Sequence, residues 1–208
     1  MKGKLFIISG PSGVGKDTIA DAQIQNPLSS KGRVLRRQGL KIQKLSTYTT
    51  RSPRPREKED KEYYFVSKKE FEKLNKDGKI LEYNIYNSDF YGTPRKDLEE
   101  ALDSGKNILL VVDVNGGLNI KKEYPKSVLI FLKSDLSDIR HRLEKRRQNS
   151  ETEIKKRLQI AKNELKSAKN YDFVVENKEG YPEKAIKEIE KIIIKKIAIT
   201  TKKIETTL

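Results

Sequence analysis

The chain has 208 residues, of which 36% are charged and 35% are hydrophobic, so it is long enough for one sizeable domain with a heavily solvated surface. It has no cysteine, which excludes disulfides and thiolate metal sites, and no run of about 20 apolar residues that could span a membrane. An apolar segment starts at Leu5, which leaves no room for a signal peptide before it, and we therefore expect a cytoplasmic protein.

The 45 basic residues outnumber the 30 acidic ones, which gives a formal net charge of +15. Such an excess attracts polyanions, such as nucleic acids, anionic membranes or nucleotide phosphates. The lysines, however, are scattered along the whole chain and form no stripe with aromatic residues, as a platform for single strands would require. We therefore expect neither a nucleic-acid nor a membrane partner. Nothing in the composition predicts an oligomeric state.

Short apolar runs alternate with amphipathic stretches, which predicts alternating strands and helices. In chain order we expect a strand at 5–8, a helix at 16–25, a short helix or basic loop at 34–40, strands at 44–49 and 63–66, a helix at 67–76 that Ser67 caps, a strand at 80–86 and a helix at 94–103. A strand at 108–113, a helix at 118–123, a strand at 128–132, helices at 136–147 and 152–168, a strand at 173–175 and a helix at 181–199 follow.

Buried strands that alternate with helices indicate an α/β fold, in which a parallel sheet is covered by helices on both faces. The stretch from about 47 to 91 interrupts this alternation and carries short strands of its own. We expect it to form a small inserted lobe with a mixed sheet.

Residues 10–18 read GPSGVGKDT and lie between the first strand and the first helix. This is the context that a phosphate-binding loop (P-loop) of the form GxxxxGK[ST] requires, because the glycines let the backbone N–H groups point at phosphate oxygens. The helix N-terminus adds a partial positive charge and Lys16 a full one. The sequence therefore predicts an ATP-binding loop that comprises Gly10, Pro11, Ser12, Gly13, Val14, Gly15, Lys16, Asp17 and Thr18.

Asp17 stands where the P-loop pattern has a hydroxyl that holds Mg²⁺. A carboxylate can bind Mg²⁺ directly, although it adds negative charge beside the β- and γ-phosphates. Thr18 can take over as the hydroxyl ligand or hold a metal-bound water. Asp17 and Thr18 are therefore both candidate ligands of a Mg²⁺ ion that binds with ATP.

A second cluster begins at residues 46–54, which read STYTTRSPR, and continues with YYFVS at 63–67, LEY at 81–83 and FYGTP at 90–94. Arg51 and Arg54 can both fork onto one phosphate dianion, and Tyr63 and Tyr91 can add hydroxyl donors to it. The cluster therefore suits a second phosphate besides those on the loop.

The same cluster also carries groups that suit guanine. Glu82 offers two acceptors side by side, which match the adjacent N1–H and 2-amino donors of guanine, whereas adenine would present an acceptor at N1. Thr47 or Thr93 can donate to the O6 atom of guanine.

In this order and spacing, the segments resemble the guanylate kinases, which pass a phosphoryl group from ATP to GMP, and the resemblance runs from about Lys4 to about Ile192. It implies a P-loop nucleoside monophosphate kinase that uses Mg²⁺ with ATP. The residues that match the family's GMP site are Thr47, Arg51, Arg54, Tyr63, Glu82, Tyr91, Thr93 and Asp113. Those that match its phosphate-closing arginines are Arg142, Arg146 and Arg157, which we expect to act in catalysis with Lys16, and Asn177 matches a residue near its adenine site.

The resemblance also implies a division of the single domain that spans residues 1–208. We expect a core at about 1–46, 92–135 and 170–199, a GMP-binding lobe at about 47–91, and a helical lid that carries the arginines at about 136–169.

Two departures from the family pattern leave alternatives open. Ribose 1,5-bisphosphate phosphokinases, a sister branch, also have Asp after the loop lysine, as this chain has Asp17, but they are not expected to retain the whole guanine set. Val111 stands where the family usually carries a second acid two positions before Asp113. A further alternative, from a different class, is an inactive interaction module, but such modules typically lose the loop lysine and the lid arginines, which this chain keeps.

Overall fold

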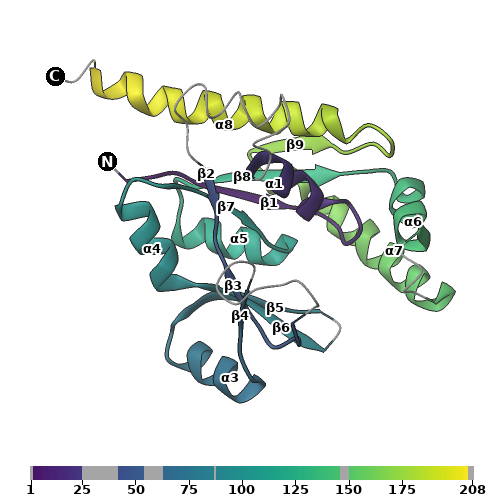
Figure 1. The fold of residues 1–208 in the computed structure, drawn as a ribbon. Helices are drawn as coiled ribbons and strands as arrows, with labels where there is room; N and C mark the ends of the chain where they lie inside the picture. The colour runs from purple at the N-terminus through teal and green to yellow at the C-terminus, as the bar shows by residue number, and fades with distance from the viewer. Residues whose placement is uncertain (1, 25–41, 54–62, 87, 146–149, 206–208) are drawn as a thin grey trace.

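The computed structural model describes residues 2–24, 42–53, 63–86, 88–145 and 150–205 (Figure 1). Arg54, Arg146 and the segment 34–40 lie outside the described residues. Among the described helices, none is both long enough and apolar enough to cross a membrane.

A parallel sheet forms the centre of the molecule, as the alternating pattern predicts. Its strands, in spatial order, are β2 (Ile42–Lys44), β7 (Asn107–Val111), β1 (Leu5–Ser9), β8 (Val128–Lys133) and β9 (Phe173–Glu176). The middle strands are apolar along nearly their whole length because helices cover both faces of the sheet. The predicted α/β fold is therefore confirmed.

Two hydrophobic layers hold the helices to this sheet. On one face, α1 (Lys16–Ile24) and α8 (Pro182–Glu205) pack through residues such as Ile19 and Ile189. On the other face, α4 (Arg95–Asp103) and α5 (Val114–Glu123) pack through residues such as Leu98 and Ile120. Figure 1 shows α8 along one side of the sheet and α4 and α5 on the opposite side.

A second, mixed sheet is built from the inserted stretch. Its strands, in spatial order, are β4 (Tyr63–Phe65), β3 (Thr47–Thr49), β6 (Asp89–Pro94) and β5 (Ile80–Tyr86). The helix α3 (Lys68–Lys76) packs on it through Phe71, which is buried and contacts the rings of Tyr83 and Phe90. Ser67 caps α3 in a reciprocal capping box with Glu70, as predicted.

Two further helices follow β8 and lie at one end of the molecule in Figure 1: α6 (Leu136–Lys145) and α7 (Glu151–Leu165). They share a small apolar core made of Ile139, Leu143, Ile154 and Ala161. The short 3-10 helix η1 (Lys166–Asn170) then leads back to β9.

The predicted single strand at 44–49 is wrong. The chain leaves the central sheet after Lys44 and enters the second sheet at Thr47, so the stretch contains two strands in two sheets. Leu45 lies between them and packs against the central core.

β6 was not predicted, because Gly92 and Pro94 usually interrupt strands. Here Gly92 is needed: a Cβ atom at this position would lie 2.8 Å from the ring of Phe71 and 2.9 Å from the Ile80 side chain. The glycine therefore lets β6 run close under α3 and beside β5.

The predicted C-terminal end of the strand at 108–113 and the predicted start of the helix at 118–123 are also wrong. The strand ends at Val111, and Asp113 instead caps α5, because its carboxylate accepts hydrogen bonds from the N–H groups of Asn115 at 2.8 Å and Gly116 at 2.9 Å. This cap starts α5 at Val114 despite the two glycines in its first turn.

Candidate active site

A cleft of about 950 Å³ lies between the central sheet, the second sheet and α7. It brings together most of the predicted site residues that the structure describes. These are Gly10, Ser12, Gly13, Gly15, Lys16, Asp17, Thr18, Thr47, Arg51, Tyr63, Glu82, Tyr91, Thr93, Asp113 and Arg157. Of the other described candidates, Pro11 and Val14 belong to the loop itself, and Arg142 and Asn177 lie behind it.

The loop between β1 and α1 adopts a backbone that only glycine favours. Gly13 and Gly15 have φ values of +83° and +92°, in the left-handed region. A Cβ atom on Gly10 would lie 2.3 Å from the carbonyl oxygen of Leu132, so this glycine lets the loop approach β8. The Nζ atom of Lys16 donates to the carbonyl oxygens of Gly10 at 2.7 Å and Pro11 at 3.1 Å, which places the ammonium group over the loop.

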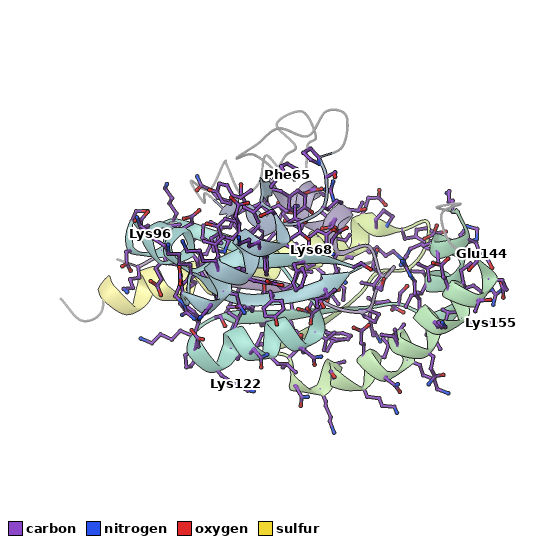
Figure 2. The ribbon with its side chains drawn as sticks, turned by 90° about the horizontal axis from the view of Figure 1, so that it is seen from below. Phe65, Lys68, Lys96, Lys122, Glu144 and Lys155 are labelled. Atoms are coloured by element: carbon purple, nitrogen blue, oxygen red, sulfur yellow. The ribbon has the colours of Figure 1, made fainter. Side chains whose placement is uncertain are left out.

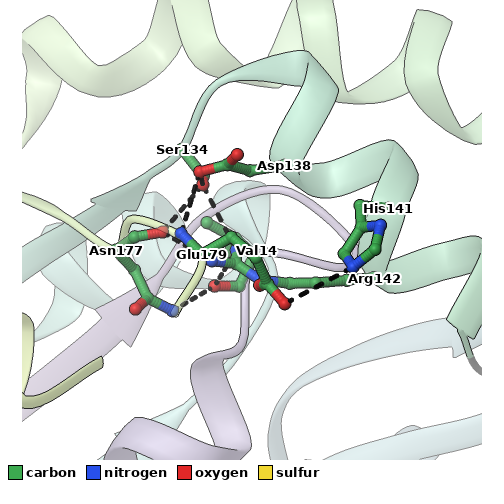
Figure 3. Close-up of polar contacts among 7 residues, drawn as sticks. All are labelled: Val14, Ser134, Asp138, His141, Arg142, Asn177 and Glu179. Atoms are coloured by element: carbon green, nitrogen blue, oxygen red, sulfur yellow. Dashed lines mark hydrogen bonds and ion pairs between the residues drawn. The ribbon is translucent and has the colours of Figure 1, made fainter. Parts of the chain in front are cut away.

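Arg142 lies at the back of this loop, as Figure 3 shows. Its side chain is 14% exposed, and its Nε atom pairs with Glu179 at 2.5 Å. Its other nitrogens donate to the carbonyl oxygen of Val14 at 3.2 Å and to that of Asn177 at 2.7 Å. In this conformation Arg142 therefore joins α6, the phosphate loop and the segment after β9.

Asn177 is bound to the same loop. Its Nδ2 atom donates to the carbonyl oxygen of Val14 at 2.7 Å, and a Cβ atom on Gly15 would lie 2.7 Å from that nitrogen (Figure 3). Its Oδ1 atom is buried and has no hydrogen-bond partner among the described residues.

Arg157 reaches the cleft from α7, and the sequence reasoning missed two of its neighbours. Ile160 and Glu164 follow it by three and seven residues, so they share its helix face, and both line the cleft. Burial raises the pKa of Glu164, while the nearby charge of Lys16 lowers it. The helical spacing from Arg157 was the signal that could have identified both residues.

The second sheet contributes an aromatic and cationic wall. The guanidinium carbon of Arg51 lies 5.1 Å from the ring centre of Tyr63, and that ring meets the ring of Tyr91 edge-on at 6.0 Å. Burial and the charge of Asp17 raise the pKa of Tyr63, whereas Lys44 and Arg51 lower it. Asp17 of the phosphate loop therefore faces the same space as this wall.

Glu82, which is half-buried, and Thr93 form a polar pair on the second sheet. The hydroxyl of Thr93, which is fully buried, donates to Oε1 of Glu82 at 2.7 Å. Burial raises the pKa of Glu82 to about 7, and the charge of Asp113 adds to the increase, while the hydrogen bond from Thr93 opposes it. Its Oε2 atom faces the first turn of α5, where a Cβ atom on Gly116 would lie 2.6 Å from it.

The donor set on the loop fits a Mg²⁺ ion that arrives with a nucleotide. Asp17 and Thr18 offer a carboxylate and a hydroxyl in the cleft beside Lys16, and Mg²⁺ takes one or two such oxygens together with phosphates and water. Within the described ranges, no group of three or more acidic or histidine side chains could hold a metal by itself. Lys44, which binds Asp21 at 3.0 Å one turn after Asp17, provides a nearby positive charge that the sequence reasoning missed.

Comparisons with known proteins agree with this arrangement. A family model described as guanylate kinase matches residues 2–196. Guanylate kinases from Latilactobacillus sakei and Lactobacillus acidophilus are 38% and 40% identical over 92% and 85% of this chain, and over 89% and 81% of their own. The crystal structure of guanylate kinase from Anaplasma phagocytophilum is 29% identical, with a TM-score of 0.66 over 92% of this chain and 85% of that one. The α/β fold of this chain and the phosphate loop that lines the cleft agree with this match, and the chain belongs to the guanylate kinase family of nucleoside monophosphate kinases.

Proposed function

We propose that this protein transfers the terminal phosphoryl group of ATP to GMP, giving ADP and GDP, with Mg²⁺ bound beside ATP. The observation that carries the proposal is that Lys16, Arg51 and Glu82 line one cavity of about 950 Å³. A donor nucleotide on the phosphate loop and an acceptor nucleotide on the second sheet therefore face each other across it. The names of the relatives support the same reaction.

On the acceptor side, the carboxylate of Glu82 accepts from N1–H and the 2-amino group of guanine. The single O–H of Thr93 holds that carboxylate in place at 2.7 Å, so Thr47 is left as the candidate donor to O6. The GMP phosphate is bound by the charged and hydroxyl groups of Arg51, Arg54, Tyr63 and Tyr91, and Asp113 completes the acceptor wall.

On the donor side, the loop N–H groups and Lys16 bind the β- and γ-phosphates, and Asp17 and Thr18 hold the metal. A Mg²⁺ ion held by these two residues would neutralise negative charge on the phosphates. Arg146 and Arg157 supply positive charge to the transferring group. Arg142, which the resemblance groups with them as catalytic, instead acts through the loop, because it binds the Val14 carbonyl oxygen behind it. Asn177 lies near the adenine. Transfer is in line and without a covalent intermediate, because positioning and charge neutralisation are sufficient for this reaction.

We assign these roles to three parts of one domain: a core at about 1–46, 92–135 and 170–199, a GMP-binding lobe at about 47–91 and an arginine lid at about 136–169. Closure of the cleft between the GMP-binding lobe and this lid would exclude water, which otherwise hydrolyses ATP. A cytoplasmic location, where both substrates occur, stays a prediction.

Asp17 favours one other enzyme, a kinase of ribose 1,5-bisphosphate, because that branch also has Asp after the loop lysine. A coupled assay for ADP release decides between the two when GMP, AMP, UMP and ribose 1,5-bisphosphate are compared side by side. Among these four acceptors, we expect ADP release only with GMP. Turnover with the sugar phosphate and not with GMP would overturn the proposal, and no ADP release with any acceptor would favour an inactive interaction module.

A further inference from the structure

Phe65 of β4 has no part in the reaction as described so far, yet it contacts Arg51 and Tyr63, which line the cleft. Its ring centre is 5.9 Å from that of Tyr63, and the guanidinium carbon of Arg51 is 5.7 Å from the Phe65 ring and 5.1 Å from the Tyr63 ring. Figure 2 shows Phe65 at the edge of the molecule, near Lys68 at the start of α3. One guanidinium group is therefore in contact range of two aromatic rings.

The backbone explains why these three side chains meet. Residues two apart in a strand share a face, so Tyr63 and Phe65 present their rings side by side. β3 runs parallel to β4 with Thr49 opposite Phe65, and the Val66 N–H donates to the Thr49 carbonyl at 2.9 Å. The Thr49 hydroxyl then accepts from the N–H of Arg51 at 3.3 Å, which turns the chain so that Arg51 reaches back over the rings.

An aromatic pair of this kind has a defined effect on an arginine. The ring faces attract the guanidinium plane and restrict a side chain that would otherwise lose much rotamer freedom on binding. A planar guanidinium held in this way can still direct N–H groups at a phosphate in a forked arrangement. Tyr63 can also donate its hydroxyl to that phosphate, but Phe65 has no polar atom and can act only through its neighbours.

We propose that Phe65 is a positioning residue for the acceptor phosphate: together with Tyr63 it holds the Arg51 guanidinium in the orientation that binds the phosphate of GMP. This proposal rests on the proposed function. It predicts that Phe65 affects the binding of the acceptor and neither the binding of ATP nor the transfer step.

The test compares Phe65→Leu, Phe65→Tyr and Phe90→Leu. In Phe65→Leu we expect the KM for GMP to rise about two- to fivefold, the range of one exposed cation–π contact, with unchanged kcat and KM for ATP. Phe65→Tyr retains the ring face, so its KM for GMP should equal that of the wild type. Phe90→Leu is the matched control, since it removes a ring from the same sheet whose partners are Phe71 and Tyr83. It should lower the melting temperature without changing the KM for GMP.

A double-mutant cycle with Arg51→Ala shows whether Phe65 acts through the arginine. In the Arg51→Ala background we expect Phe65→Leu to have no further effect on GMP affinity, measured by calorimetry. An equal loss in both backgrounds, or an equal loss in Phe90→Leu, would overturn the proposal. If the Leu variant melts too low for assay, Phe65→Met, whose unbranched side chain adapts to irregular space, replaces it in the same cycle. A wild type that does not bind GMP would refute the proposed function, whereas a wild type and a Phe65→Leu variant that bind GMP equally would refute only the role of Phe65.

Discussion

The pKa of Glu82 makes GMP binding depend on pH in a direction that the structure determines. Burial raises this pKa to about 7 in the ligand-free protein. The proposed contact with guanine needs the ionised carboxylate, because both of its oxygens accept hydrogen bonds. Binding must therefore first remove a proton wherever the pH lies below about 7, and GMP affinity should increase as the pH rises through this value.

The size of the effect follows from the same pKa. With a pKa of about 7, Glu82 is largely protonated at pH 6 and largely ionised at pH 8. The affinity for GMP should then be about tenfold weaker at pH 6 than at pH 8, because only about a tenth of the Glu82 carboxyl groups are ionised at pH 6. Calorimetric titrations with GMP alone at several pH values between these limits would measure it.

The variant Glu82→Gln provides the control for this measurement. Glutamine faces a guanine donor with a donor of its own, and an unpaired buried polar group costs about 1–3 kcal/mol, so GMP efficiency should fall roughly ten- to a hundredfold. The phosphate of GMP also titrates near pH 6, and this contribution remains in the variant while that of Glu82 disappears. An identical pH profile in both proteins, or wild-type affinity that decreases as the pH rises, would refute the role of Glu82.

The raised pKa of Glu82 also predicts that folding stability depends on pH, with a sign opposite to that of GMP binding. Its folded pKa of about 7 lies above the ordinary value of 4.5, so the folded state binds the proton more tightly. Its contribution to stability is therefore complete below about pH 4.5 and is lost as the pH rises through about 7. At pH 8, Glu82→Gln should consequently melt at a higher temperature than the wild type while binding GMP more weakly, and the gain should vanish near pH 5.

Three other predictions concern the loop and the cleft. Lys16→Ala should lower kcat by orders of magnitude with an unchanged melting temperature, and near-normal turnover would contradict the catalytic role of Lys16. Asp17→Asn should raise the Mg²⁺ concentration for half-maximal rate, because a charged ligand is lost. An unchanged Mg²⁺ titration would exclude a metal role for Asp17. Asp17→Ser, which restores the usual hydroxyl, is the comparison. Small-angle scattering should show a smaller radius of gyration with an ATP analogue plus GMP than without either, because the cleft closes. Ile160→Ser should reduce this decrease. Equal radii of gyration with and without the ligands would argue against closure.

The central sheet could be predicted because buried parallel strands leave a strong local signal, as in the apolar runs of β1, β7 and β8. The second sheet could be predicted only in part. β6 contains Gly92 and Pro94, and only the proximity of Phe71 shows why the glycine is required. The start of α5 was also missed, because Asp113 reads equally well as the end of a strand and as a helix cap.

Most of the predicted site residues that the structure describes line the cleft, whereas Arg142 and Asn177 lie behind the phosphate loop. The missed residues, such as Glu164 and Phe65, belong to a helix and a strand whose orientation depends on tertiary packing. A sequence shows that Arg157 and Glu164 share a helix face, but it does not show that this face points at the phosphate loop. Phe65 reads as an ordinary strand residue until Arg51 is seen over its ring.

The position of Arg142 bears on how the cleft closes. Its guanidinium binds the carbonyl oxygen of Val14, and a Cβ atom on Gly13 would lie 3.3 Å from the side chains of both Ile139 and Leu143, so α6 is fastened directly to the phosphate loop. α7 shares an apolar core with α6 and is therefore held to the loop as well.

The second sheet is attached differently. The chain enters it between Lys44 and Thr47 and leaves it at Pro94, so only two short connections join it to the central sheet through the backbone. Ile85 on this sheet and Ile160 on α7 both line the cleft and are 54% and 53% exposed. Movement of the second sheet toward α7 would bury both isoleucines and bring the acceptor wall to the phosphate loop, whereas movement of α6 would have to break the contacts of Arg142. We therefore expect closure to carry the second sheet with its bound nucleotide toward the loop and helix pair. Such a movement keeps the contacts of Arg142 but must shift those that join the sheet to α4, such as the hydrogen bond from the Tyr64 hydroxyl to Asp97 at 2.8 Å.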